Sequence, residues 1–291
     1  MALILIDISN LLYRAFYTLP PEKFKRSDGL ATNAVYGVST MITKIINKMK
    51  KEYKDIHIVC CFDSNTCNST RLAIDPNYKK NRPKAPQEMG PQFSIVREMI
   101  KSMHLEVMDI PNMEADDIIS SLVHKYNSKY TETIICSPDK DYSQLLHYDN
   151  VKQYNAKKEL FITGNDICTS YGIPPVHFTM YQALVGDKCD NIPGCPGIGP
   201  KNAVSLITYY MGDINKLIED ESPPKQLQKK IDIVKNNMES YNKSLQLVTL
   251  MNNDSLTLNS IYTPNIHTED FHEFCEKYEF TSYLKKKSLF K

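Results

Sequence analysis

Short apolar runs that end in acidic residues constrain this chain more than any other feature. Asp7 follows the run at 3–6, Asp63 follows the run at 57–62, and Asp139 comes soon after the run at 133–136. These runs alternate with helical patterns, which predicts a parallel sheet, and the carboxyl ends of parallel strands meet at one edge. The sequence therefore brings several carboxylates to the same edge of one sheet.

Further acids stand at a third strand exit and beside a Gly-rich turn. The full set of candidate metal ligands is Asp7, Asp63, Glu114, Asp116, Asp117, Asp139, Asp141, Asp187 and Asp190. Carboxylates gathered this closely repel one another unless cations neutralise them. Oxygen donors without a nearby His suit Mg²⁺ or Mn²⁺ better than Zn²⁺. Acids two or three residues apart on one segment can reach a pair of ions, so we expect two divalent ions.

Composition excludes several classes of protein. The eight cysteines contain no C-x-x-C pair, which argues against a disulfide framework or a zinc site and favours buried thiols in a reducing compartment. The N-terminal run lacks a basic leader, and no segment approaches the roughly 20 apolar residues of a membrane span. We therefore expect a soluble, intracellular protein that does not contact membranes.

The texture of the sequence changes near residue 166. Residues 1–166 alternate strand and helix patterns, including helices at 33–53 and 93–103, and Asn112 is a candidate N-cap for the helix that carries the acids at 114–117. Residues 167–291 have helical patterns joined by loops. The lysine-rich end at 285–291 is expected to be a solvated terminus. The sequence thus predicts an α/β domain followed by an all-helical domain.

A glycine-rich turn precedes the helical run at 203–210. It consists of Gly197, Ile198, Gly199, Pro200, Lys201 and Asn202. Glycine lets backbone amides approach a phosphate closely, and the helix N-terminus behind the turn adds positive potential. An ordinary helix-to-helix turn with a Gly C-cap is the alternative. The combination of two glycines, a lysine and a following helix favours a hairpin that grips a nucleic-acid backbone without reading its sequence.

The segment 71–84 is strongly basic and follows the strand exit at Asp63. Tyr78 offers a ring on which an unpaired base could stack, and Lys79, Lys80 and Arg82 suit a phosphate backbone. A basic run is often only a solvated surface. Its position beside an acidic centre favours nucleic-acid binding, because a polyanion needs positive charge to approach carboxylates.

Together these motifs resemble the bacterial-type 5′-nuclease family, which includes the 5′-3′ exonuclease domain of DNA polymerase I and, more distantly, flap endonucleases. The resemblance rests on residues 6–14, 34–37, 62–63, 78–82, 114–117, 139–141, 186–194 and 197–201. It implies a PIN-like parallel-sheet domain at 1–166 with a helical arch at about 64–104, and a helix-hairpin-helix domain at 167–291. The arch segment 65–75 departs from the pattern usual in the family.

The resemblance also implies roles for residues. Asp7, Asp63, Glu114, Asp116 and Asp139 would serve one metal ion, Asp141, Asp187 and Asp190 a second, and Asp117 would lie in the same cluster. Lys79 and Arg82 would be catalytic, with Arg71, Tyr78 and Lys80 in contact with DNA. Some family members hold K⁺ on hairpin carbonyls, which here would be those of Leu184, Val185, Pro193, Cys195 and Ile198.

We therefore expect a monomeric Mg²⁺-dependent 5′-3′ exonuclease and 5′-flap endonuclease that hydrolyses DNA at 5′ ends, flaps and nicks. It would serve primer removal and repair in a bacterial-type cytoplasm or in an organelle with bacterial-type replication. A PIN-type ribonuclease acting on single-stranded RNA would share the acidic core without needing the hairpin. A structural DNA-binding protein would use the hairpin alone, but nine acids beside a DNA groove would weaken its binding.

Overall fold

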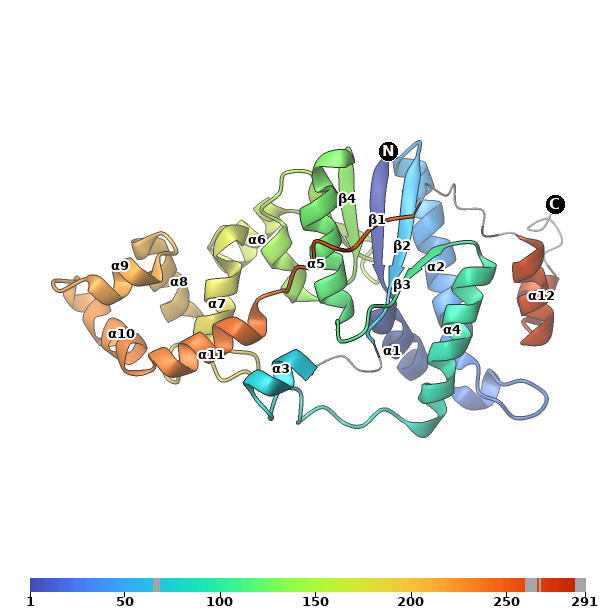
Figure 1. Cartoon of the computed structure of the whole chain (residues 1–291), viewed down its shortest axis with the longest axis horizontal. Coiled ribbons are helices and arrows are strands. Elements are labelled where there is room, and N and C mark those ends of the chain that lie inside the picture. The colour runs from blue at the N-terminus through green and yellow to red at the C-terminus, as the bar shows by residue number, and fades with distance from the viewer. Residues whose placement is uncertain (65–68, 260–265, 267, 286–291) are drawn as a thin grey trace.

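The computed structural model describes residues 1–64, 69–259, 266 and 268–285 (Figure 1). Residues 65–68 of the expected arch and 286–291 of the lysine-rich end lie outside this part. Within it, a six-stranded sheet has the order β3-β2-β1-β4-β5-β6. The strands are β1 (Ala2–Asp7), β2 (Ile56–Cys61), β3 (Glu106–Met108), β4 (Glu132–Cys136), β5 (Val151–Asn155) and β6 (Leu160–Ile162).

Strands β1 to β5 are parallel, as predicted, and their register aligns the acidic exits. Asp7 pairs with Cys61 of β2, and Ile6 pairs with Cys136 of β4. The chain therefore leaves β1, β2 and β4 at one edge. β6 is antiparallel to β5, so the expectation of a wholly parallel sheet is wrong there. Only residues 156–159 connect these two strands, and a parallel crossover needs a dozen residues or more.

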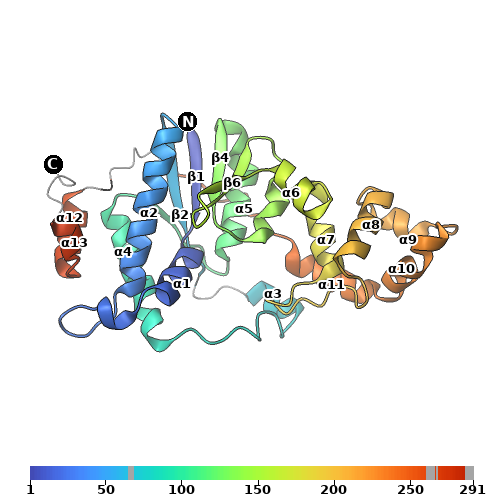
Figure 2. The ribbon, with the colours of Figure 1, turned by 180° about the vertical axis from the view of Figure 1, so that it is seen from behind.

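Helices cover both faces of the sheet and extend beyond one end of it. They are α1 (Ile8–Thr18), α2 (Asn33–Glu52), α3 (Ser69–Ile74), α4 (Gly90–Ser102), α5 (Ala115–Tyr126), α6 (Gly164–Tyr171), α7 (Phe178–Val185), α8 (Pro200–Tyr210), α9 (Ile214–Glu219), α10 (Lys225–Asn236), α11 (Met238–Val248), α12 (Glu269–Lys277) and α13 (Thr281–Leu284). Seen from both sides, α8 to α10 lie at one end of the molecule and α12 at the other (Figures 1 and 2).

The central strand β1 shows why its sequence is apolar throughout. Leu3 and Leu5 belong to the core cluster that contains Ile118 of α5, whereas Ile4 and Ile6 belong to the cluster that contains Ile42 of α2. Successive side chains of a strand point to opposite faces, so a strand covered on both faces must be apolar at every position. This burial fixes the strand exits that carry the acids.

One local expectation differs from the structure. Glu114, not Asn112, is the N-cap of α5, and Asn112 has a positive φ of 62° in the turn before it. The domain boundary near residue 166 stays a prediction, and Asp166 itself lies in α6, where its carboxylate accepts a hydrogen bond from the Thr163 amide in a capping box. Asn and Asp suit turns as well as helix starts, which is why the cap was misplaced by two residues.

The arch expected at about 64–104 stays a prediction, and part of this range packs in the core. Helix α4 buries Ile95, Val96 and Met99 in the cluster beneath the sheet, so it belongs to the α/β domain. Between residues 69 and 89, the structure has α3 and a 3-10 turn at Gln87–Met89.

The seven cysteines that the structure describes are free. Cys168 and Cys189 are exposed, so the expectation of uniformly buried thiols is wrong for these two. None of the helices in the described part of the chain is long and apolar enough to span a membrane.

Candidate metal centre and nucleic-acid interface

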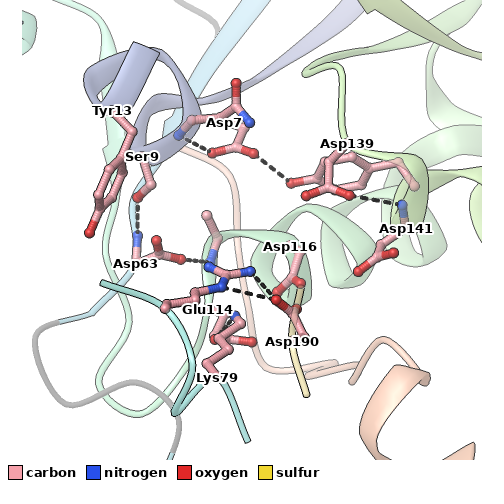
Figure 3. A pocket seen from close by; sticks show the side chains of 14 residues that line it. Asp7, Ser9, Tyr13, Asp63, Lys79, Glu114, Asp116, Asp139, Asp141 and Asp190 are labelled. Carbon is pink, nitrogen blue, oxygen red and sulfur yellow. Dashed lines mark hydrogen bonds and ion pairs between the residues drawn. The ribbon is translucent and has the colours of Figure 1, made fainter. Parts of the chain in front are cut away.

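A cavity of about 260 Å³ lies at the carboxyl edge of the sheet, where residues from β1, β2, β4 and the arch meet (Figure 3). Seven of the nine predicted acids line it: Asp7, Asp63, Glu114, Asp116, Asp139, Asp141 and Asp190. Lys79 and Arg82 line the same cavity. Residues spread over more than 180 positions of the sequence are thus brought around one space.

Backbone amides hold the strand-exit acids in place. Asp7 caps α1, and its carboxylate accepts the Asn10 amide at 2.9 Å. The Asp63 carboxylate accepts the Ala115 amide at 2.8 Å at the start of α5. Each acid therefore satisfies a free amide of a helix start with one of its two carboxylate oxygens.

The sequence did not single out the hydroxyl groups that order these acids. Ser137 and Tyr142 donate to Asp7 Oδ2 at 3.1 and 3.2 Å, and Ser9 Oγ accepts the Asp63 amide at 3.0 Å. Ser137 is two residues from Asp139, and Ser9 is two residues from Asp7. This proximity in the sequence is the only feature that indicates a role for the two serines. The exposed ring of Tyr13 also lines the cavity.

Several of these carboxyls are protonated more easily than usual. Burial and the nearby charge of Asp63 raise the pKa of Asp7 to about 7. Burial and Asp139 raise the pKa of Asp141 to about 7. Burial and Glu114 raise the pKa of Asp116 well above its ordinary value. In the described part of the chain, none of these three acids forms an ion pair with a basic side chain.

This electrostatic state fits a divalent metal centre. The donors are oxygen atoms, which hard cations such as Mg²⁺ prefer. Carboxylate oxygens of Glu114, Asp116 and Asp117 lie within 4.8 Å of one another. Unbalanced negative charge in a partly enclosed space is relieved by a bound cation, so the residues present suit such ions.

Glu114 contacts side chains of the basic segment 71–84. Lys79 Nζ pairs with Glu114 Oε1, and Tyr78 OH donates to Oε2 at 3.2 Å. Burial alone would raise the pKa of Glu114, but the positive charges of Lys79 and Arg71 outweigh it and hold this pKa below its ordinary value. A second acid of the cavity also contacts the basic segment, since Arg82 Nε donates to Asp190 Oδ1 at 2.9 Å.

Two residues expected to contact DNA are instead buried. Arg71 and Tyr78 expose only 2% and 5% of their surface. The Tyr78 ring packs between Arg71 and Lys79, with cation–ring distances of 5.9 and 4.9 Å. The expected DNA contact of Arg71 and the expected base stacking on Tyr78 stay predictions, and in this structure neighbouring charges and core side chains cover both groups.

Asp117 and Asp187 do not line the cavity. Asp117 is fully buried and accepts two hydrogen bonds from Arg71, both at 2.8 Å. Asp187 pairs with Lys140 at 2.8 Å. Burial raises the pKa of Asp187, but the hydrogen bond and charge of Lys140 together with backbone hydrogen bonds outweigh it and hold this pKa below its ordinary value. Lys140 lies between Asp139 and Asp141 in the sequence, and this position indicated that it could pair with an acid of the centre.

The glycine-rich hairpin presents backbone groups at the start of α8. Gly199 is the N-cap of α8 and is exposed, as are Gly197, Pro200 and Lys201, and Asn202 is partly buried. The side chain of Ile198 points into the core, so only its backbone is available to a ligand. The exposed amides and Lys201 together form a site suited to a phosphate.

The five positions considered for K⁺ lie at the end of α7 and in the turn that leads to α8. The Leu184 carbonyl accepts the Cys195 amide at 2.8 Å, and the Cys195 carbonyl accepts the Ile198 amide at 2.9 Å. A carbonyl has two lone pairs, so each can still reach an ion. The K⁺ site stays a prediction.

Comparison with known proteins places this geometry in a family. A family model described as "5′-3′ exonuclease, N-terminal resolvase-like domain" matches residues 2–172, and one described as "5′-3′ exonuclease, C-terminal SAM fold" matches residues 173–267. The chain belongs to the 5′-3′ exonuclease family of nucleases. Membership confirms the resemblance inferred from the sequence motifs.

Individual relatives agree with this assignment. The chain is 35% identical over 218 residues to a 5′-3′ exonuclease of Aquifex aeolicus, covering 75% of this chain and 72% of the relative. It is 34% identical over 237 residues to DNA polymerase I of Rhizobium leguminosarum, covering 80% of this chain and 23% of the polymerase. The T5 D15 protein co-crystallised with metal ions has the same fold, with a TM-score of 0.67 at 22% identity over 86% of this chain and 90% of its own.

Proposed function

We propose that this member of the family is a divalent-metal-dependent 5′-3′ exonuclease that also cuts 5′ flaps in DNA. The observation that carries the proposal is the acid-lined cavity, with Lys79 and Arg82 at its wall and a phosphate-suited hairpin on the same polypeptide. Mg²⁺ or Mn²⁺ are the ions that suit this donor set.

The residues divide between two ion positions. Asp7, Asp63, Glu114, Asp116 and Asp139 would hold one ion, and Asp141 and Asp190 would hold a second, joined by Asp187 if Lys140 releases it. When bound, such ions lower the pKa of water and stabilise charge on the attacking and leaving oxygens of a phosphodiester. The acids themselves would position the ions with their carboxylate oxygens.

Lys79 and Arg82 serve the phosphate. In the structure both are paired with acids, Lys79 with Glu114 and Arg82 with Asp190. Neutralisation of those acids by cations frees the two basic groups to bind the phosphate that reacts and to stabilise its developing charge. Tyr13, rather than Tyr78, offers the exposed ring at the cavity against which a base at the 5′ end can stack.

The hairpin and Lys80 would bind the DNA backbone away from the phosphodiester that is cleaved. The exposed amides at Gly197 and Gly199 and the side chain of Lys201 would bind one phosphate of the duplex, and Lys80 would bind the single strand. Because these contacts read no base, they support specificity for a DNA structure and not for a sequence. We assign the activity to primer removal and repair by a monomer in a bacterial-type cytoplasm or organelle.

Cleavage of a 5′-labelled flap tests the proposal directly. In Mg²⁺ the protein should release short 5′ products from a flapped or nicked duplex. Asp63→Asn and Asp116→Asn should each lower the rate roughly a hundredfold or more. Asp213→Asn is the matched control, because the Asp213 carboxylate also accepts backbone amides at a helix start but lies outside the cavity. Equal cleavage by all four proteins would refute the site.

A ribonuclease acting on single-stranded RNA is the rival function. The phosphate-suited hairpin favours a duplex substrate, since a single strand would leave it without a partner. Equimolar 5′-flapped DNA and single-stranded RNA in one reaction discriminate between the two. Preferred cleavage of the RNA would favour the rival.

A further inference from the structure

Arg71 has an acceptor for each of its five guanidinium N–H groups. Nη1 donates to Glu114 at 2.5 Å and to Asp117 at 2.8 Å, and Nη2 donates to Asp117 at 2.8 Å. The other two bonds go to main-chain carbonyls, from Nε to Leu247 at 3.0 Å and from Nη2 to Thr249 at 3.3 Å. A guanidinium with five partners and 2% exposure has no group left for DNA.

These partners come from distant parts of the chain. Arg71 lies in α3, its acidic partners lie at the start of α5, and its carbonyl partners lie at the end of α11, where α3 and α11 are neighbours (Figure 1). We call residues 247–253 the strap, because they run from α11 onto α5. The Met251 amide of the strap donates to Asp117 Oδ1 at 2.9 Å, and the Asn253 amide donates to Ser121 Oγ at 2.9 Å.

The contacts make Arg71 and the strap dependent on each other. Without the strap carbonyls, the guanidinium would lose the two bonds that fix its plane, and a bidentate contact to Asp117 depends on that plane. Without Arg71, Asp117 and Glu114 would share a buried space with less positive charge. Glu114 also accepts Lys79, so its orientation affects a basic side chain at the cavity wall as well.

We propose that Arg71 is a positioning residue that couples docking of the strap to the geometry of Glu114 in the metal centre. The inference rests on the proposed function, which assigns Glu114 as a metal ligand. Asp117 belongs to this device as the buried carboxylate that binds Arg71 and the strap together. The strap thereby acts on the metal centre through Arg71, Asp117 and Glu114.

Arg71→Lys tests the coupling, because an amine keeps the charge but cannot make five bonds in a plane. Hydrogen–deuterium exchange of the metal-free protein should show faster exchange at Met251 and Asn253 together with residues 75–82. Mn²⁺ affinity, measured by calorimetry without DNA, should fall roughly 10- to 100-fold, as is usual when the partner of a ligand is removed. The kcat on a flapped duplex should fall while KM changes little.

Arg97→Lys is the matched control. Arg97 is another partly buried arginine paired with an acid, Asp109 at 2.6 Å, but it makes no hydrogen bond to the strap. It should leave exchange of the strap unchanged. Faster strap exchange in both variants would mean general loosening and would overturn the coupling.

Ser121→Ala keeps the test decisive if Arg71→Lys does not fold. It removes the acceptor of the Asn253 amide and changes no charge. Faster strap exchange with weaker Mn²⁺ binding supports the proposal, whereas a loosened strap with unchanged Mn²⁺ affinity overturns it.

A DNA role for Arg71 gives a different result. Metal-free DNA binding by Arg71→Lys would then weaken, because an amine cannot make the bidentate phosphate contact of a guanidinium. That outcome would also overturn the proposal. The exchange and Mn²⁺ results do not depend on nuclease activity. Failure of the proposed function can therefore be distinguished from failure of the Arg71 coupling.

Discussion

Replacing Asp7 with Asn should stabilise the metal-free protein. Burial and Asp63 raise the pKa of Asp7 to about 7, so keeping this group ionised in the folded state costs free energy at pH 8. Asn caps a helix as well as Asp does, so the bond from the Asn10 amide is retained. The hydroxyls of Ser137 and Tyr142 can rotate to accept from the new amide.

The magnitude follows from proton linkage. A rise from 3.8 to about 7 corresponds to roughly 3 pKa units, or about 4 kcal/mol at most. The folded state binds a proton that the unfolded state has lost between these values, so wild-type stability falls as pH rises from about 4 to 7. We expect Asp7→Asn to raise the free energy of unfolding by about 2–4 kcal/mol at pH 8, and by nearly nothing at pH 4.

Urea denaturation in EDTA at several pH values measures this difference. Asp213→Asn is the control, since Asp213 caps α9 at the surface and its pKa is lowered, with backbone hydrogen bonds as the main cause. Saturating Mg²⁺ should reverse the order, because the wild type gains more binding free energy than the variant. Equal stability of Asp7→Asn and wild type at pH 8 in EDTA would refute the electrostatic reasoning.

The remaining predictions concern metal, chemistry and DNA. Because the pKa values of Asp7 and Asp141 are raised to about 7, Mn²⁺ affinity should increase from pH 6 to 8 with proton release, which calorimetry in buffers of different ionisation enthalpy detects. Lys79→Ala should lower kcat on a flapped duplex about 10²- to 10³-fold with little change in metal affinity. Lys140→Met should tighten Mn²⁺ binding in a calorimetric titration, because Lys140 neutralises one of the acids of the second ion. Lys201→Ala should weaken duplex binding and reduce its salt slope by about one, seen by fluorescence anisotropy.

Each of these has an opposite outcome that would count against it, and for Lys140→Met that outcome is unchanged or weaker Mn²⁺ binding. Mn²⁺ affinity that is flat with pH would contradict the raised carboxyl pKa values. Loss of metal affinity in Lys79→Ala would assign that residue to folding of the centre. Unchanged salt dependence in Lys201→Ala would remove the hairpin from the DNA interface.

The acidic centre could be predicted from the sequence because it depends on local rules. A strand covered on both faces is apolar at each position. The first acid after the apolar run therefore marks the end of the strand in the sequence, as at Asp7 and Asp63. Parallel strands then leave at one edge, and that topology brings the acids together without knowledge of any side-chain contact. The hairpin at Gly197 and Gly199 could also be predicted from local sequence, since closely spaced glycines indicate a turn.

The contacts of Arg71 could not be predicted in this way. Its carbonyl partner Leu247 is 176 residues away in the sequence, and a carbonyl leaves no trace in residue identity. A basic residue beside other basic residues therefore suggested a DNA contact, although the residue is buried. The packing of Phe271 and Tyr283 against the α2 side of the sheet was hidden likewise, because aromatic residues near a terminus do not indicate their partner.

Anomalous diffraction from a crystal soaked in Mn²⁺ tests the central claim most directly. The account predicts two peaks inside the cavity, one among the carboxylates of Asp7, Asp63 and Asp116 and one beside Asp141 and Asp190. An empty cavity at saturating Mn²⁺, or ions bound only at surface acids such as Asp213, would contradict it.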